Sequence, residues 1–177
     1  MILAISGSLR RDSLNSAALR AAARAAARTG VLVELDDFAR RLPHFDADLE
    51  ADPPETVRLF RERLARADAV ILAVPEYAFG IPGTLKNALD WTVGGGTLDQ
   101  KPVSVLSVAQ QGRGAQVRQA LGRVLEALNC EVTWHHVPIH PSLLDDGEIR
   151  DRGIVAELAR VVQATRGSAG GDPALSG

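Results

Sequence analysis

The sequence predicts an α/β protein in which helices cover both faces of one parallel sheet, giving three layers. Short aliphatic runs alternate five times with longer segments of helical period, a pattern typical of parallel strands joined by helical crossovers. The third and fourth runs, AVILAV and VSVLSV, are mostly apolar, as expected of strands buried on both faces. The length of 177 residues fits one domain. We assign it to residues 1–166 and expect the glycine-rich segment 167–177 to be a flexible tail.

The five predicted strands span residues 2–6, 31–36, 69–74, 103–109 and 131–137. The last strand mixes polar and apolar residues, which is typical of a strand at the edge of a sheet. Right-handed connections of these lengths favour the strand order 2-1-3-4-5, which is the flavodoxin-like order. In such a sheet, ligands bind beyond the carboxyl ends of the strands where the order reverses. The loops after the first, third and fourth strands are therefore the candidate site.

Each predicted helix carries an apolar stripe at a spacing of three or four residues. Gly30 is expected to end the first helix. Pro54 and Pro82 mark the starts of the second and third, because the first turn of a helix tolerates a missing N–H. The stripes of the later four helices are Val57, Phe60, Leu64 and Ala67; Leu85, Ala88, Leu89 and Thr92; Val117, Leu121, Val124, Leu125 and Leu128; and Ile154, Leu158, Val161 and Val162.

Charge and cysteine content argue against several classes of protein. The net charge of -2 argues against a nucleic-acid-binding protein, which would be basic. Cys130 is the only cysteine, so the chain has no internal disulfide and suits a reducing compartment. No apolar run approaches the roughly 20 residues of a membrane span, and no basic leader precedes the first strand. We therefore expect a cytoplasmic protein with neither nucleic-acid nor membrane partners.

The loop after the first strand has the composition of a phosphate-binding loop. It places the hydroxyls of Ser8 and Ser13, the amide of Asn15 and the guanidinium of Arg10 at the start of a helix. The unpaired N–H groups and dipole of a helix N-terminus favour an anion, and arginine adds charge-assisted hydrogen bonds. The alternative is that Asp12 or Ser13 is only an N-cap, which leaves the rest of the cluster unexplained.

The acidic pair Asp36 and Asp37 ends the second strand, where dinucleotide-binding folds carry a ribose-binding carboxylate. The pair lies too far along the chain from Gly7 for that role. Leu9 and Asp12 also break the G-x-G-x-x-G pattern. We therefore expect Asp36 and Asp37 to be solvent-exposed turn residues.

The loop after the third strand, residues 75–83, is stiff and aromatic. Its sequence PEYAFGIPG holds two prolines and two glycines, which restrict the backbone. Tyr77 and Phe79 at the tip suit a platform for a planar ligand better than a core. The loop after the fourth strand, residues 107–114, carries glycines that permit close backbone approach to a ligand. Gln110 can reach a polar edge of that ligand.

The segments GSLRRDSLN (residues 7–15) and PEYAFGIPGTLKNALDW (residues 75–91) together resemble the NADPH-dependent FMN reductase family of flavodoxin-like proteins. That family includes quinone, azo-dye and chromate reductases, and the resemblance extends from residue 2 to about residue 128. It implies that FMN is bound, with the phosphate at the first loop and the ring along the second. The family's asparagine after P-E-Y is replaced by Ala78, which removes a polar side chain beside the flavin.

The cofactor-binding residues predicted from the loops and the resemblance share one edge of the predicted sheet. They are Ser8, Arg10, Ser13, Leu14, Asn15, Pro75, Glu76, Tyr77, Ala78, Phe79, Ser107, Gln110 and Gly112. No catalytic acid–base pair is predicted, because the cofactor of a flavoenzyme carries the chemistry. No metal site is predicted either, because His135 and His136 alternate between the two faces of a strand.

The resemblance implies an NAD(P)H-dependent flavin oxidoreductase. Hydride would pass from NADPH or NADH to FMN and then to a small-molecule acceptor: free flavin, a quinone, an azo compound or a metal oxyanion. The resemblance also implies a homodimer or homotetramer. Two alternatives stay open, a flavodoxin-type electron carrier and an FMN-binding module without turnover. The near-neutral charge argues against the carrier, which should be acidic, whereas Ala78 keeps the second alternative open.

Overall fold

The computed structural model describes residues 1–170 and contains one parallel five-stranded sheet. The order is β2-β1-β3-β4-β5, and every neighbouring pair is parallel, which confirms the predicted fold class and strand order. The strands are β1 (Ile2–Ser6), β2 (Val33–Asp36), β3 (Ala69–Ala73), β4 (Pro102–Ser107) and β5 (Glu131–His136). Their ends differ from the predicted ones by no more than two residues.

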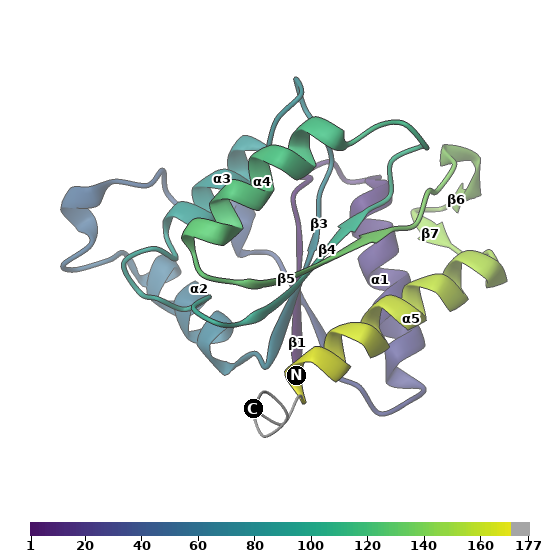
Figure 1. Ribbon diagram of the computed structural model, residues 1–177, viewed down its shortest axis with the longest axis horizontal. Helices are drawn as coiled ribbons and strands as arrows, with labels where there is room; N and C mark the ends of the chain where they lie inside the picture. The colour runs from purple at the N-terminus through teal and green to yellow at the C-terminus, as the bar shows by residue number, and fades with distance from the viewer. Residues whose placement is uncertain (171–177) are drawn as a thin grey trace, which may run out of the picture.

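Helices cover both faces of the sheet, as predicted. Figure 1 shows α2 (Glu55–Arg66), α3 (Gly83–Asp90) and α4 (Ala115–Ala127) on one face. The other face carries α1 (Leu14–Ala27) and α5 (Arg152–Ala169). Gly30 has a φ of 70° just after α1, which agrees with its predicted role in ending that helix.

The last helix extends past the predicted end of the domain. It runs to Ala169, with Gly170 at its C-cap, so the boundary at residue 166 is three residues too early. Gly167 is tolerated because it lies near the end of a long helix whose buried residues, such as Val162 and Thr165, already fix its position. The rest of the expected tail, residues 171–177, lies outside the described residues.

The two faces of the sheet bury different kinds of side chain. Towards α1 and α5 the core is rich in alanine, with Ala17, Ala18, Ala21 and Ala22 all buried, because small side chains let α1 pack close to the sheet. Towards α2, α3 and α4 it holds larger residues, including Phe60, Leu72 and Leu121. Both layers pack against the sheet and hold the strands in place. Because all neighbouring strands are parallel, their carboxyl ends meet at one edge, which carries the loops of the site.

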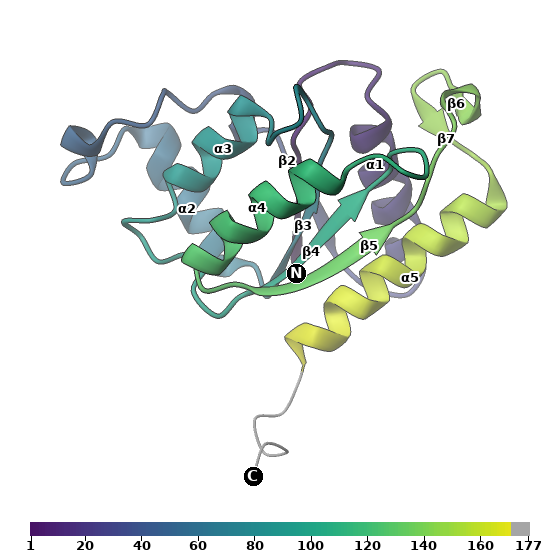
Figure 2. The same cartoon turned by 45° about the horizontal axis from the view of Figure 1, so that its top comes forward.

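Short elements that the hydrophobic pattern did not predict surround this core. They are the 3-10 turns Phe38–Arg40, Ala47–Leu49 and Pro141–Leu143, and a hairpin of β6 (Leu144–Asp145) and β7 (Glu148–Ile149). Figure 2 shows the hairpin between β5 and α5 along the chain. Arg20 of α1 holds it, because the Arg20 Nε lies 3.0 Å from Glu148 Oε1. Segments of two or three residues are too short to show a hydrophobic period.

Candidate functional site

A hollow of about 260 Å³ lies at the carboxyl edge of the sheet, between the start of α1 and the loops after β3, β4 and β5. We call this hollow the cradle. Five of the predicted cofactor-binding residues line it: Leu14, Asn15, Pro75, Glu76 and Gln110. The other lining residues are Val74, Val108, Ala109, Arg113, Ile139 and Pro141. Sequence reasoning missed Ile139 and Pro141, although the loop after the fifth strand ends at the same edge as the other three.

The N-terminus of α1 opens into the cradle without an internal cap. Ser13 occupies the N-cap position, but its side chain makes no capping hydrogen bond, so the alternative that Ser13 serves only as a cap is wrong. The first-turn N–H groups of a helix have no intrahelical partners. Asn15 is only 7% exposed, and its Oδ1 has no hydrogen-bond partner. Leaving such an acceptor unpaired costs about 1–3 kcal/mol, so the arrangement fits a polar ligand. The free N–H groups of the first turn add a preference for an anion.

Either end of the Asn15 amide can face that ligand, because a half-turn of the side-chain amide exchanges its oxygen and nitrogen. With the nitrogen inward, the amide donates to an anion together with the N–H groups of the first turn of α1. With the oxygen inward, it accepts from a ligand hydroxyl. The residues present therefore suit a sugar-phosphate or ribityl-phosphate chain, which carries both kinds of group.

A hydrogen bond joins the first loop to the second. Ser8 Oγ lies 3.0 Å from Tyr77 Oη, and Ser8 is buried. The Ser8 hydroxyl also accepts from the Arg10 N–H at 3.4 Å. The Arg10 side chain is exposed and makes no hydrogen bond or ion pair within residues 1–170. Neither Ser8 nor Arg10 lines the cradle. Ser8 is buried where the first loop meets the second, and Arg10 is exposed to solvent.

The tip of the second loop is a tight hairpin. Tyr77 and Gly80 exchange backbone hydrogen bonds of 3.3 and 2.9 Å, and the two residues between them have positive φ, 47° for Ala78 and 60° for Phe79. Such two-residue turns favour asparagine and glycine, which adopt positive φ readily. An asparagine at position 78, as the resemblance implies for the family, would therefore suit the backbone conformation as well as supply a polar side chain. Ala78 adopts the same conformation at a cost of about 1 kcal/mol.

The aromatic side chains of this hairpin face solvent. Tyr77 is 51% exposed and Phe79 is 74% exposed, so neither contributes much to the core. They are available to contact a planar ligand or a second molecule.

Glu76 has a second role that the sequence did not reveal. Its Oε2 accepts a hydrogen bond of 3.1 Å from the Val117 N–H in the first turn of α4. The N-cap of α4 is Gly114, which has no side chain to cap the helix and adopts a φ of 94°. The Glu76 carboxylate therefore caps α4 from a different loop while its residue also lines the cradle.

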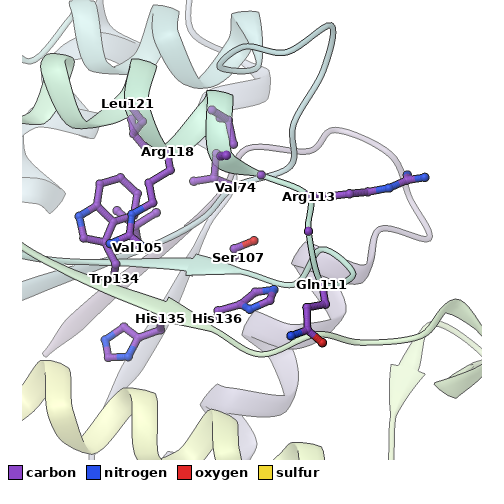
Figure 3. A pocket seen from close by; sticks show the side chains of 14 residues that line it. Val74, Val105, Ser107, Gln111, Arg113, Arg118, Leu121, Trp134, His135 and His136 are labelled. Atoms are coloured by element: carbon purple, nitrogen blue, oxygen red, sulfur yellow. The ribbon is translucent and has the colours of Figure 1, made fainter.

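The third loop separates the cradle from a second hollow, shown in Figure 3. This hollow, of about 360 Å³, lies between α4 and β5, and we call it the α4 hollow. Ser107 and Gly112, predicted for the flavin site, line the α4 hollow, whereas the Gln110 amide donates to the Ile139 carbonyl at 2.8 Å on the cradle side. The predicted third-loop residues therefore divide between two hollows.

The two acidic residues at the end of β2, Asp36 and Asp37, have different surroundings. Asp37 is exposed and pairs with Arg41 at 2.7 Å, as expected of a turn residue. Asp36 is not solvent-exposed: its side chain is fully buried, and its Oδ2 accepts from the Phe38 N–H at 3.0 Å. Burial raises the pKa of the Asp36 carboxyl to about 6. The prediction that Asp36 is exposed was wrong, because no hydrophobic period reveals that the Phe38–Arg40 turn folds over this carboxylate.

The lone thiol is not suited to nucleophilic chemistry. Burial raises the pKa of Cys130 to about 11, so the thiol stays protonated at neutral pH. None of the helices within residues 1–170 has the length and apolar character needed to cross a membrane.

Comparisons with known proteins agree with this geometry. A family model described as NADPH-dependent FMN reductase matches residues 1–143. A quinone reductase of Pseudomonas putida strain KT2440 is 41% identical over 133 residues, which cover 68% of each chain. Another Pseudomonas putida quinone reductase is 37% identical over 85% of each chain. The solved structure of the flavoenzyme NAD(P)H:(acceptor) oxidoreductase FerB from Paracoccus denitrificans superposes with a TM-score of 0.77 at 28% identity, covering 95% of this chain and 96% of that one.

Proposed function

The chain belongs to the NADPH-dependent FMN reductase family, and we propose that it transfers hydride from NADPH or NADH, through FMN held in the cradle, to a small-molecule acceptor. Quinones are the acceptors that the named relatives support best. Free flavins, azo compounds and metal oxyanions are further candidates from the family resemblance. The observation that carries the proposal is the uncapped N-terminus of α1 beside the buried, unpartnered Asn15 amide.

The residues of the first loop would hold the phosphate of FMN. The first-turn N–H groups of α1 supply donors and a favourable dipole, and Asn15 and Ser8 add polar side chains from buried positions. The exposed Arg10 adds a positive charge that closes over the phosphate from the solvent side. Ser13 contributes its position at the helix start, and Leu14 forms part of the wall.

The second and third loops would hold the ring. Pro75 and Glu76 line the cradle, and the strained hairpin of Ala78 and Phe79 presents Tyr77 at its edge. From the third loop, Gln110 lines the cradle. Its side-chain amide donates to the Ile139 carbonyl at 2.8 Å, which fixes this wall of the ring site.

FMN, when bound, supplies the redox chemistry: two electrons arrive as hydride from the nicotinamide, and two electrons leave to the acceptor together with protons from solvent. The chain's own part is to bind and orient. The rigid carboxyl edge fixes the three loops, and the exposed hairpin leaves one side of the site open so that donor and acceptor can enter in turn. No side chain at the cradle is required to act as a proton donor in this scheme.

A cytoplasmic location and a homodimeric or homotetrameric state belong to the same proposal. The lone cysteine supports a reducing compartment. Phe79, a large apolar side chain that is 74% exposed, supports burial of the hairpin against a second copy. Light scattering after size-exclusion chromatography tests the oligomeric state, and a monomer at micromolar concentration would contradict that part of the proposal.

The activity is tested with purified protein reconstituted with FMN. We expect a flavin absorption spectrum that stays with the protein through gel filtration, and oxidation of NADPH or NADH that depends on an added quinone such as 1,4-benzoquinone. FMN binding without turnover would favour a binding module instead. Absence of FMN binding at saturating concentration would overturn the proposal.

A further inference from the structure

The α4 hollow has the shape and size of a small-molecule site. Its volume of about 360 Å³ lies within the range of about 300–1,000 Å³ that is typical of such sites. Val105, Val117 and Leu121 form an aliphatic wall, and Trp134 of β5 forms an aromatic one. Figure 3 shows the Trp134 ring beside Val105 and Leu121, at the end of the hollow away from the third loop.

A cation lies at the aromatic wall. The guanidinium carbon of Arg118 is 4.8 Å from the centre of the Trp134 ring, and Figure 3 shows the Arg118 side chain extending towards that ring. Within residues 1–170, Arg118 forms no ion pair with a carboxylate. The α4 helix presents this arginine on the exposed side of the hollow, so its charge is available to a ligand.

The remaining polar groups of the hollow also favour an anion. Ser107, Gln111 and Arg113 carry hydrogen-bond donors, whereas the His136 Nε2–H is already donated to the Ala109 carbonyl at 2.9 Å. None of the lining residues, all of which belong to the described part of the chain, is acidic. An anion would therefore meet donors and positive charge without a competing carboxylate.

We propose that the α4 hollow binds a planar aromatic ring that bears an anionic group. The ring lies against the aliphatic wall and the edge of Trp134, where it buries apolar surface, while the face of Trp134 stays in contact with Arg118. The anionic group lies at Arg118. The inference comes from this hollow alone and holds whether or not the cradle binds FMN.

Two kinds of molecule share this chemistry. One is an aromatic carboxylate, and the other is the adenosine phosphate portion of a nicotinamide nucleotide. Both would lie beside the cradle, because Val74 and Arg113 border both hollows.

Isothermal titration of the full chain, with and without FMN, tests the proposal with two probes, 2-naphthoate and adenosine 2′-monophosphate. We expect at least one of them to bind with a submillimolar Kd. 2-Naphthoate alone would identify an aromatic-acid site, whereas tighter binding of the nucleotide would identify a site for the phosphorylated donor. If neither probe binds, the proposal is wrong.

Matched variants locate the binding. Arg118→Gln should raise the Kd of the probe about tenfold, because one charge-assisted contact is lost. Arg123→Gln removes the same charge from an exposed position on the same helix that does not line the hollow, and it should leave the Kd unchanged. Both positions are exposed, so both variants should fold. Equal effects of the two substitutions, or equally tight binding of the neutral analogue 2-naphthalenemethanol, would overturn the proposal.

Discussion

The N-termini of α1 and α4 lie at the same edge of the sheet and follow the first and third loops of the site, yet their free N–H groups are satisfied in different ways. The α4 terminus has a glycine at its N-cap and receives the Glu76 carboxylate, which accepts from the Val117 N–H. The α1 terminus has a serine at its N-cap that makes no capping bond, and the Asn15 amide beside it has an unpartnered oxygen. One terminus is satisfied by the protein's own anion, and the other is left for a ligand.

This difference shows that a helix N-terminus is not by itself a binding site. The dipole and the free N–H groups exist at both termini, but Glu76 already neutralises one of them. Neither helix has an acidic residue in its first turn. What distinguishes α1 is that, within the described residues, no carboxylate from another segment accepts from its first-turn N–H groups, and that the polar side chains of Ser13 and Asn15 are buried there. Two kinds of substitution test this difference: one adds a carboxylate at the α1 terminus, and the other removes the carboxylate from the α4 terminus.

Asn15→Asp should have the largest effect, because it places an internal carboxylate at the α1 terminus. Juxtaposed like charges cost several kcal/mol, so we expect FMN binding to weaken by about 3 kcal/mol, measured by fluorescence titration of the flavin. Asn15→Ala is the matched control, since it removes the amide without adding charge and should cost only about 1 kcal/mol. Equal losses in the two variants would show that charge at this terminus is unimportant.

Asp36→Asn tests a second native carboxylate, at the end of β2. Unlike Glu76, it does not cap an α-helix; its Oδ2 accepts from the Phe38 N–H of a short 3-10 turn. Its Oδ1 makes no hydrogen bond, and the Arg63 guanidinium is 3.7 Å away. Because burial raises its pKa from 3.8 to about 6, the folded state holds the proton more tightly than the unfolded state. The carboxyl therefore lowers the free energy of unfolding progressively as the pH rises from about 4 to about 6.

We expect Asp36→Asn to raise the free energy of unfolding at pH 8 by about 2 kcal/mol. The difference from the wild type should shrink below pH 6 and vanish near pH 4, as measured by urea denaturation across that range. Asp37→Asn is the control, since that side chain is exposed. It removes only a minor contribution to the raised pKa of Asp36, so the pH dependence of its difference from the wild type should be much smaller. A constant difference at all pH values would contradict the assignment to this titration.

Glu76→Ala removes the anion from the α4 terminus. We expect the free energy of unfolding to fall by about 1.5 kcal/mol, because a helix cap formed by a charged acceptor is lost. The ratio of the Kd values for riboflavin and FMN should stay constant, since Glu76 is not proposed to contact the phosphate. A change in that ratio without a loss of stability would show that Glu76 acts on the ligand rather than on α4.

Tyr77→Phe should have the smallest effect. It tests whether the second loop supports phosphate binding near α1 through Ser8. The Tyr77 hydroxyl lies 3.0 Å from Ser8 Oγ, and we expect its loss to weaken FMN binding by about 1 kcal/mol, one neutral hydrogen bond. Riboflavin, which lacks the phosphate, should bind as before. If the affinity for riboflavin falls as much as that for FMN, Tyr77 acts on the ring and not through Ser8.

The fold and one end of the site could be predicted from the sequence because both depend on local pattern. Alternating apolar runs and helical stripes identified five strands and five helices. Of the polar cluster predicted at the start of α1, Asn15 lines the cradle, whereas Ser8 does not line it and instead bonds to Tyr77 of the second loop. The division of Ser107 and Gln110 between two hollows, by contrast, depends on how the third loop turns over the sheet, which no spacing reveals.

The three-layer architecture and the strand order follow from local sequence pattern, because burial of periodic apolar residues permits few other arrangements. Which helix terminus stays open depends on contacts between distant segments. Glu76 reaches Val117 across 41 residues of chain, and the Phe38–Arg40 turn folds over Asp36. Whether a carboxylate is buried, capped or free is set by contacts between distant segments, and a local pattern carries no information about these contacts.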